Sequence, residues 1–248
     1  MTIESDADLL GLKAVGRVTA LIIQEMIARA EPGMSTLELD MIGKDLFERY
    51  GARSAPQLTY NFPGYTCISV NEEAAHGIPG SRILQPGDML NIDVSTELNG
   101  YFADTGATCV VPPTTPLKQK LCYAGKLALQ RAIAKARDGA PLNGIGKAIQ
   151  GVAREKGFKV IRNLCSHGVG RALHEEPKEI AGFYDPKDRR RLRKGMVITI
   201  EPFLSTRSRY VSEADDGWTL VAEAGNLSAQ YEHTMVITEG KPILVTAL

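Results

Sequence analysis

The sequence predicts an α+β fold built from two similar halves, about residues 1–111 and 112–248, within a single domain spanning 1–248. In each half, two segments with helical hydrophobic periodicity come first and several short, strand-like apolar runs follow. No stretch rich in Gly, Ser or Pro separates the halves, which favours one domain around a shared site. No repeat is visible residue by residue, so the duplication is inferred from the order of the elements alone.

The first half is predicted to begin with two helices. They start at Ser5 and Ser35, each three residues before an acidic residue, which is the pattern of a capping box. They are expected to end before Pro32 and at about Tyr50, since Pro and Gly terminate helices. The aromatic segment 54–65 is expected to be irregular. Strands are predicted at 66–71, 89–94 and 101–111.

The last two of these strands are predicted to form a hairpin around Asn99-Gly100, the strongest short signal for a two-residue turn. With the turn there, Asp104 lies opposite Ser95, and Asp93 points to the same face of the sheet as Ser95. Asp93 and Asp104 become diagonal neighbours, with Cα atoms about 7–8 Å apart. Two aspartates on a solvated face are one interpretation; a metal site is the other.

The second half repeats the order of helices and then strands. Thr115 is expected to cap a helix that runs to Arg137, with a proline in its first turn. Asn143 is expected to cap another helix that reaches about Lys156. Strands are predicted at 159–162, 196–203, 218–221, 229–237 and 243–245.

Composition excludes several classes of protein. Hydrophobic residues make up 44% and charged residues 23%, and the basic and acidic residues, 29 of each, cancel. No net charge attracts the chain to nucleic acid or to a membrane, and neither is an expected partner. We find no signal peptide and no apolar run of membrane-spanning length, so we expect a cytoplasmic protein. The basic run 187–194 is most simply a solvated face, with an RNA contact as the alternative.

Histidines are few and unevenly placed. His76, His167 and His174 lie in stretches punctuated by Gly or Pro, which are typical of loops that form a site. His233 lies in a predicted strand and is interpreted as structural, because alternation turns Glu232 to the opposite face, toward the site.

A cluster of carboxylates is the second indication of a site. Glu201 lies inside the apolar run MVITIEPF, where an unpaired glutamate is unfavourable. Asp93, Asp104, Glu201 and Glu232 together carry four negative charges, which two divalent ions would balance. With a histidine ligand, Mn, Fe, Co or Zn suits such a site better than Mg.

Motifs of other hydrolases and nucleotide-binding proteins are missing. The sequence has no HExxH, GxSxG or Walker pattern. A cysteine nucleophile, Cys67 or Cys165, stays open as an alternative, although unsupported cysteines are usually inert.

Six motifs in a fixed order carry a family resemblance: CISVNEEAAHGIPG, GDMLNIDV, GYFADTG, CSHGVGRALHEEP, ITIEP and SAQYEHT. On these motifs the chain closely resembles the type I methionine aminopeptidases. The resemblance implies the pita-bread fold, in which two α+β halves surround a central antiparallel sheet. It also implies removal of the initiator methionine from peptides with a small second residue, by attack of a metal-activated water.

The resemblance assigns roles to particular residues. Two divalent ions (Co, Mn, Fe or Zn) would be held by five ligands: Asp93, Asp104, His167, Glu201 and Glu232. Asp104 and Glu232 would bridge the ions, and Glu201 would also act as general base. The catalytic set is completed by two substrate-contacting histidines, His76 and His174. The methionine pocket would be lined by Phe62, Tyr65, Cys67 and Trp218. One Na or K ion would lie near Asn71 and Ser228.

The sequence departs from the family pattern at Leu173, where many members have an aromatic residue, and in segment 54–65. Both changes concern the pocket rather than the chemistry. An X-Pro aminopeptidase or dipeptidase of the same fold, and an inactive binding relative, are the alternatives. The expected partners are peptide N-termini, nascent chains and the ribosome, and a monomer is expected.

Overall fold

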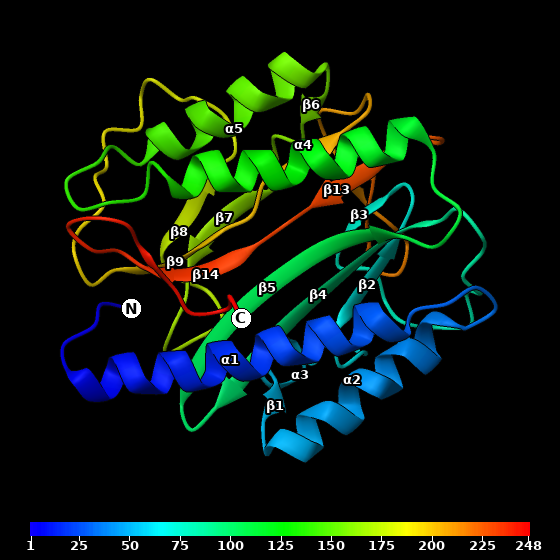
Figure 1. Cartoon of the computed structure of the whole chain (residues 1–248), viewed down its shortest axis with the longest axis horizontal. Helices are drawn as coiled ribbons and strands as arrows, with labels where there is room; N and C mark the ends of the chain where they lie inside the picture. Colours follow the sequence, from blue (N-terminus) through cyan, green and yellow to red (C-terminus); the bar gives the residue numbers. More distant parts are fainter.

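The computed structural model describes residues 1–248 and has an α+β architecture in which antiparallel strands lie between two pairs of helices (Figure 1). One pair is α1 (Asp6–Arg29) and α2 (Thr36–Tyr50). The other is α4 (Pro116–Ile133) and α5 (Asn143–Lys156). The predicted repetition of two helices followed by strands is therefore present. None of the helices combines the length and the hydrophobicity that a membrane span requires.

The first two helices begin where their capping boxes place them. Ser5 Oγ accepts a hydrogen bond from the Asp8 backbone N–H at 3.2 Å, and the Asp8 carboxylate accepts one from the Ser5 N–H. Ser35 and Glu38 make the same pair of bonds. Each box satisfies two N–H groups that have no partner inside the helix.

Three helix predictions need correction. Segment 54–65 is not wholly irregular, because it contains the short helix α3 (Ala55–Tyr60), capped by Ser54. The helix α4 ends at Ile133 rather than Arg137. Asn143 is not the N-cap of α5; its side-chain amide instead donates to the carbonyl oxygens of Asp185 and Asp188, which ties the helix start to a distant loop.

Strands form two main sheets and two small ones, all antiparallel. The first main sheet has the order β1-β4-β2, with β5 paired to β4; the second has the order β15-β14-β9-β7-β8. The members of the first are β1 (Arg53–Ser54), β2 (Cys67–Val70), β4 (Met89–Leu98) and β5 (Tyr101–Val110). The members of the second are β7 (Cys165–Gly168), β8 (Glu175–Ala181), β9 (Val197–Ile200), β14 (His233–Val236) and β15 (Ile243–Leu244).

The small sheets have the orders β13-β10-β6 and β11-β12-β3. Their strands are β3 (Glu73–Ala75), β6 (Lys159–Val160), β10 (Phe203–Ser205), β11 (Ser212–Glu213), β12 (Leu220–Val221) and β13 (Ser228–Gln230).

Two predicted strands are each broken at a glutamate. The run 196–203 divides into β9 and β10 at Glu201-Pro202, where proline offers no N–H to a ladder. The run 229–237 divides into β13 and β14 around Glu232, whose N–H donates at 2.8 Å to the Gly106 carbonyl of the other half. Both glutamates therefore lie at strand breaks between the sheets.

The two halves are joined along β5 by specific hydrogen bonds. Thr105 Oγ1 donates to the Glu232 carbonyl at 2.7 Å, and the Asp104 N–H donates to Thr234 Oγ1 at 2.9 Å. Gly106 permits this approach: a Cβ atom there would lie 2.1 Å from Gln230 Oε1. These bonds place Glu232 against the hairpin that carries Asp104.

Each helix pair packs its own apolar core against the strands. Buried residues such as Leu121, Ile145 and Met235 fill the space between α4, α5 and the second sheet. Residues such as Ile68 and Leu90 do the same beneath α1 and α2. The site lies between these two cores, where the polar strand residues meet.

The register of the β4–β5 hairpin is the predicted one. Leu98 pairs with Tyr101, and Ser95 pairs with Asp104. Asn99 and Gly100 form the turn with φ of 52° and 79°, a conformation that only Gly, Asn and Asp adopt readily. Asp93 and Asp104 therefore share one face of the sheet.

Replacing Asn99-Gly100 with Ala-Ala is expected to lower the free energy of unfolding by about 1–3 kcal/mol, because alanine is strained at positive φ. Urea unfolding followed by circular dichroism measures the change. Gly240→Ala is the control, since Gly240 lacks positive φ and a Cβ there meets no atom within 4 Å. If the turn variant unfolds at the same urea concentration as the control, the turn does not constrain the hairpin.

Candidate active site

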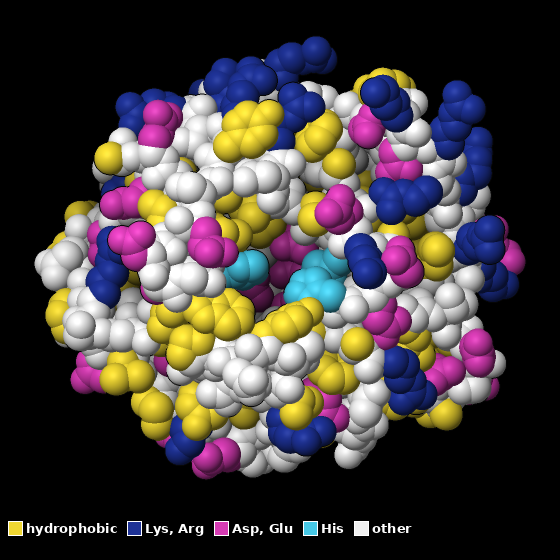
Figure 2. Space-filling view, turned by 180° about the vertical axis from the view of Figure 1, so that it is seen from behind, with side chains coloured by type: hydrophobic (Ala, Val, Ile, Leu, Met, Phe, Trp, Pro, Cys, Tyr) yellow, Lys and Arg dark blue, Asp and Glu magenta, His cyan; other side chains and the backbone are white.

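Acidic and histidine side chains converge on a cavity of about 430 Å³ between the two halves. Figure 2 shows histidine side chains on two sides of a hollow at the centre of one face, with acidic side chains at its bottom and hydrophobic side chains around it. The cavity is lined by Asp93, Asp104, His167 and Glu201 among others. Glu232 lies beneath this surface, with only 2% of its area exposed.

The hairpin supplies two of these carboxylates. Asp104 accepts a hydrogen bond at 2.8 Å from Ser95 Oγ, its cross-strand partner. Asp93 accepts one at 3.2 Å from the side-chain amide of Gln230. Both side chains are thereby oriented by residues that cannot neutralise their charge.

His167 lies on β7 rather than in a loop, which corrects the prediction. Its backbone N–H donates to Thr199 Oγ1 at 3.1 Å, and its Nδ1 lies 2.9 Å from the Gly168 carbonyl oxygen. Because a carbonyl only accepts, Nδ1 carries the proton and Nε2 presents a lone pair. Nε2 lies 3.5 Å from Glu201 Oε1 and 3.8 Å from Asp104 Oδ2.

The two glutamates at the strand breaks are held differently. Glu201 Oε1 accepts a hydrogen bond at 3.0 Å from Thr199 Oγ1, and the Glu201 N–H donates to Ser166 Oγ at 2.9 Å. Glu232 Oε2 accepts one at 3.0 Å from Gln230. The other oxygen, Glu232 Oε1, is buried and has no hydrogen-bond partner in the protein.

Burial is the main cause of the electrostatic strain in this cluster. It raises the pKa of Asp93, Glu201 and Glu232 well above their usual range, and the neighbouring carboxylates raise these pKa values further. Burial also raises the pKa of Asp104, to about 6. The pKa of His167 is lowered to about 3, first by burial and then by His174.

These residues fit a divalent cation. One ligand atom from each of Asp104, His167 and Glu232 lies within 4.8 Å of the others. An unprotonated imidazole nitrogen and carboxylate oxygens are suitable donors for a first-row divalent ion. A cation would also satisfy the orphaned Glu232 Oε1 and offset the repulsion between the buried carboxylates. The cluster therefore has the composition of a metal centre.

Two further histidines lie at the rim of the cavity. His76 follows β3 with φ of 55°, and His174 immediately precedes β8. The rings of His174 and His167 have centroids 4.1 Å apart. Burial lowers the pKa of both His76 and His174. Tyr60 Oη lies 2.7 Å from His174 Nδ1, a contact that the sequence did not predict.

Apolar side chains form another wall of the cavity. Phe62 and Trp218 meet edge to face with ring centroids 5.2 Å apart, and Cys67 and Leu173 lie beside the same space. Tyr65 does not line it, contrary to the prediction. Its backbone is held by Asp40 of α2 at 2.9 Å, and it lines a separate surface hollow beside that helix.

Asn71 and Ser228 have partners of their own. The Asn71 side chain donates to Asp88 Oδ1 at 2.8 Å and accepts from the Met89 N–H at 2.9 Å. Ser228 Oγ accepts from the Asn226 side chain at 3.1 Å. A monovalent cation near these residues stays a prediction.

Sequence reasoning missed the polar residues that orient the cluster. Gln230 lies two residues before Glu232, and Thr199 lies two residues before Glu201. Ser166 immediately precedes His167 and accepts a hydrogen bond from the Glu201 N–H. Gln230 and Thr199 stand inside the motifs SAQYEHT and ITIEP. Strand alternation puts residues i and i+2 on one face, and this was the signal that could have identified Gln230 and Thr199.

A chelator is expected to destabilise the protein more at about pH 7.5 than at about pH 5. Without a cation, the raised pKa of Asp104 lets the folded state bind more protons than the unfolded state between about pH 4 and pH 6. Stability of the metal-free protein therefore falls as the pH rises through this window, by on the order of 3 kcal/mol for Asp104 alone. Thermal unfolding with and without EDTA at both pH values checks this, and equal shifts in Tm would contradict it.

Comparison with known families identifies one match that covers most of the chain. The model of metallopeptidase family M24 matches residues 11–239. The match includes both helix pairs except the start of α1, and all of the residues that form the cavity.

Individual relatives extend the similarity to the whole chain. Methionine aminopeptidase 2 of Bacillus subtilis is 47% identical over 249 aligned positions, which cover all of both chains. Methionine aminopeptidase 1 of the same organism is 39% identical over 92% of each chain. The crystal structure of methionine aminopeptidase from Thermotoga maritima superimposes over all of both chains with a TM-score of 0.95 and 31% identity. Prolidase from Pyrococcus furiosus shares the fold, with a TM-score of 0.79, 21% identity and 66% of its chain covered.

Proposed function

Because the chain belongs to metallopeptidase family M24 and matches methionine aminopeptidases over its whole length, we propose that it hydrolyses the first peptide bond of chains that begin with methionine. It is a metal-dependent aminopeptidase of the pita-bread fold. Its preferred substrates have a small second residue.

The buried cluster of four carboxylates and one histidine is the observation that carries this proposal. Two divalent ions would be held by five residues: Asp93, Asp104, His167, Glu201 and Glu232. Support comes from the 4.8 Å group of ligand atoms (Asp104, His167 and Glu232) and from the orphaned Glu232 oxygen. Bound divalent ions supply Lewis acidity and lower the pKa of a coordinated water. All five side chains are present, which argues against an inactive binding relative.

Glu201 acts as the general base. Its carboxylate faces the cavity, and an ionised carboxylate there can accept a proton from water. Thr199 donates to one oxygen, Oε1, and so fixes the orientation of the carboxylate. Glu201 takes a proton from the attacking water and returns it to the leaving amine.

His174 and His76 hold the scissile amide. When the Tyr60 hydroxyl donates to His174 Nδ1, the His174 proton is on Nε2, which can donate to the developing oxyanion. Burial lowers the pKa of His174, which favours the neutral ring, and the Tyr60 hydroxyl then selects the tautomer. His76 contacts the amide from the other side of the cavity.

The apolar wall takes the methionine side chain. Phe62, Cys67 and Trp218 offer aromatic and sulfur surfaces suited to a thioether. Leu173, with only 3% of its area exposed, occupies the place where many relatives have an aromatic ring. It changes the shape of the pocket rather than its apolar character.

A panel of peptides tests the proposal. Met-Ala-Ser and Met-Gly peptides are expected to be cleaved with kcat/KM at least tenfold above that for X-Pro peptides. The X-Pro enzymes share the fold with this chain at low sequence identity, so preferential X-Pro cleavage would assign the chain to that class instead. No cleavage of either class by protein shown to contain metal would favour an inactive relative.

Replacing His76 with alanine is expected to lower kcat/KM about 10²-fold or more while leaving the metal content unchanged, because His76 contacts substrate and not metal. Activity on Met-Ala-Ser and metal content by mass spectrometry are measured on the same sample. His233→Ala is the control: His233 bonds Thr246 at 3.0 Å outside the cavity. Metal loss in the His76 variant would refute its assignment.

Peptide N-termini are the substrates, and nascent chains are the biological source that we propose. A ribosome contact through the run 187–194 stays a prediction; there Arg190 pairs with Asp188 and Lys194 with Glu239, so part of the charge is already balanced. The monomeric state, the cytoplasmic location and the identity of the metal are also predictions.

A further inference from the structure

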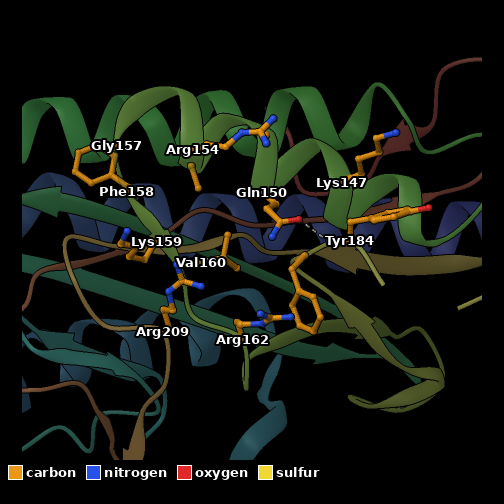
Figure 3. Close-up of a pocket in the computed structure, with 13 residues that line it drawn as sticks. Lys147, Gln150, Arg154, Gly157, Phe158, Lys159, Val160, Arg162, Tyr184 and Arg209 are labelled. Carbon is orange, nitrogen blue, oxygen red and sulfur yellow. Dashed lines mark hydrogen bonds between the residues drawn. The ribbon is translucent and has the colours of Figure 1, made fainter. Parts of the chain in front are cut away.

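A second cleft lies away from the metal centre, between α5, β6 and the segment that follows β8 (Figure 3). Its volume is about 470 Å³, which is within the range of small-molecule sites. Gln150 and Arg154 come from α5 on one side, and Arg162 and Arg209 come from the opposite side. It shares no lining residue with the metal centre.

The cleft is strongly basic. Five of its thirteen lining residues are cations and none is a carboxylate: Lys147, Arg154, Lys159, Arg162 and Arg209. None of the five side chains makes an ion pair or a hydrogen bond within the protein. Other cations in this half of the chain do have partners: Arg131 and Lys156 share Glu155, and Arg207 pairs with Glu223. Although the whole chain has zero net charge, the five cations of the cleft produce a local positive potential and leave N–H donors free.

Aromatic rings form part of the wall. The Arg162 guanidinium carbon lies 4.0 Å from the centroid of the Phe183 ring, and Lys147 Nζ lies 5.4 Å from that of Tyr184. The Tyr184 N–H donates to the side-chain oxygen of Gln150 at 3.2 Å, which fixes this segment to α5. The cations are therefore held next to flat surfaces on which a ring can stack.

We propose that this cleft binds a nucleotide, with its phosphates on Arg154, Lys159 and Arg162 and its base against Phe183. Guanidinium groups match the geometry of phosphate oxygens, and a stacked arginine and aromatic ring suit a base. The volume suits one nucleotide unit.

Isothermal titration of the metal-loaded full chain with ADP at low salt tests the proposal. Saturable binding with submillimolar Kd is expected, and R154Q/K159Q is expected to raise Kd at least tenfold. Both side chains are exposed, so the substitutions are expected to leave folding intact. R189Q/R193Q removes two exposed charges outside the cleft and is the matched control, with a change in Kd below twofold.

The Phe183→Leu substitution tests the contact with the base separately from the contacts with the phosphates. It is expected to raise the Kd for ADP about fivefold and to leave the Kd for inorganic pyrophosphate unchanged.

Three results would each overturn the proposal. The first is no saturable ADP binding up to about 1 mM, and the second is equal weakening by R189Q/R193Q. The third is binding of a single-stranded oligoribonucleotide, sensitive to R154Q/K159Q, without binding of ADP, which would make the cleft part of a nucleic-acid surface.

Discussion

Replacing Glu201 with glutamine is expected to lower kcat on Met-Ala-Ser by about 10²–10⁴-fold, the usual contribution of a general base. The substitution keeps the size of the side chain and the acceptor that Thr199 Oγ1 bonds at 3.0 Å. It removes the ability to take up a proton, together with one negative charge of the proposed metal site. KM is expected to change much less, because Glu201 acts on the reacting water rather than on the methionine side chain.

Loss of metal would give the same loss of activity, so metal content is measured on the Glu201→Gln protein by mass spectrometry. Glu179→Gln is the control, because Glu179 is exposed on β8 and does not line the cavity. Its activity is expected to stay within twofold of the unsubstituted protein. Near-normal kcat in Glu201→Gln with metal bound would exclude Glu201 as the base.

Replacing Asp104 with asparagine is expected to remove most of the bound metal and to lower kcat/KM by about 10³-fold or more. Asp104 belongs to the group of ligand atoms that lie within 4.8 Å of one another, and its charge acts on each of the other three carboxylates. A neutral amide at this position leaves the cation with a poorer ligand and one less negative charge. Metal affinity is measured by titration after chelation, with activity followed in parallel.

The Ser95→Ala variant is the matched comparison for the Asp104→Asn variant. It deletes the hydroxyl that donates to Asp104 Oδ1 at 2.8 Å and leaves the charge in place. Loss of such an orienting partner typically costs 10–100-fold in metal affinity, which is less than the loss expected for Asp104→Asn. Equal metal affinity in the Asp104→Asn and unsubstituted proteins would show that Asp104 is not a ligand.

Local signals in the sequence predicted the hairpin and the helix starts because each depends on a few neighbouring residues. The Asn99-Gly100 turn fixed the register, and strand alternation then put Asp93 and Asp104 on one face. The capping boxes at Ser5 and Ser35 are equally local. A two-residue turn or a cap has only a few conformations, so short patterns predict it well.

The strand breaks were not predictable in the same way. The runs 196–203 and 229–237 read as continuous strands, and β7 with His167 read as a loop. Their conformations are decided by bonds to residues far away in the sequence: the Glu232 N–H bonds the Gly106 carbonyl, and the His167 N–H bonds Thr199. Hydrophobic periodicity carries no information about such partners.

By itself, then, the sequence determined the fold class, the hairpin geometry and the motifs that resemble a metallopeptidase family. Only the tertiary structure decided which side chains surround the cavity: it placed Tyr60 on His174, turned Tyr65 toward α2, and left one oxygen of Glu232 buried without a partner. The physical reason is that these properties depend on contacts between residues that lie far apart in the sequence. A carboxylate becomes a metal ligand through burial beside other carboxylates, and burial is set by packing across the whole chain.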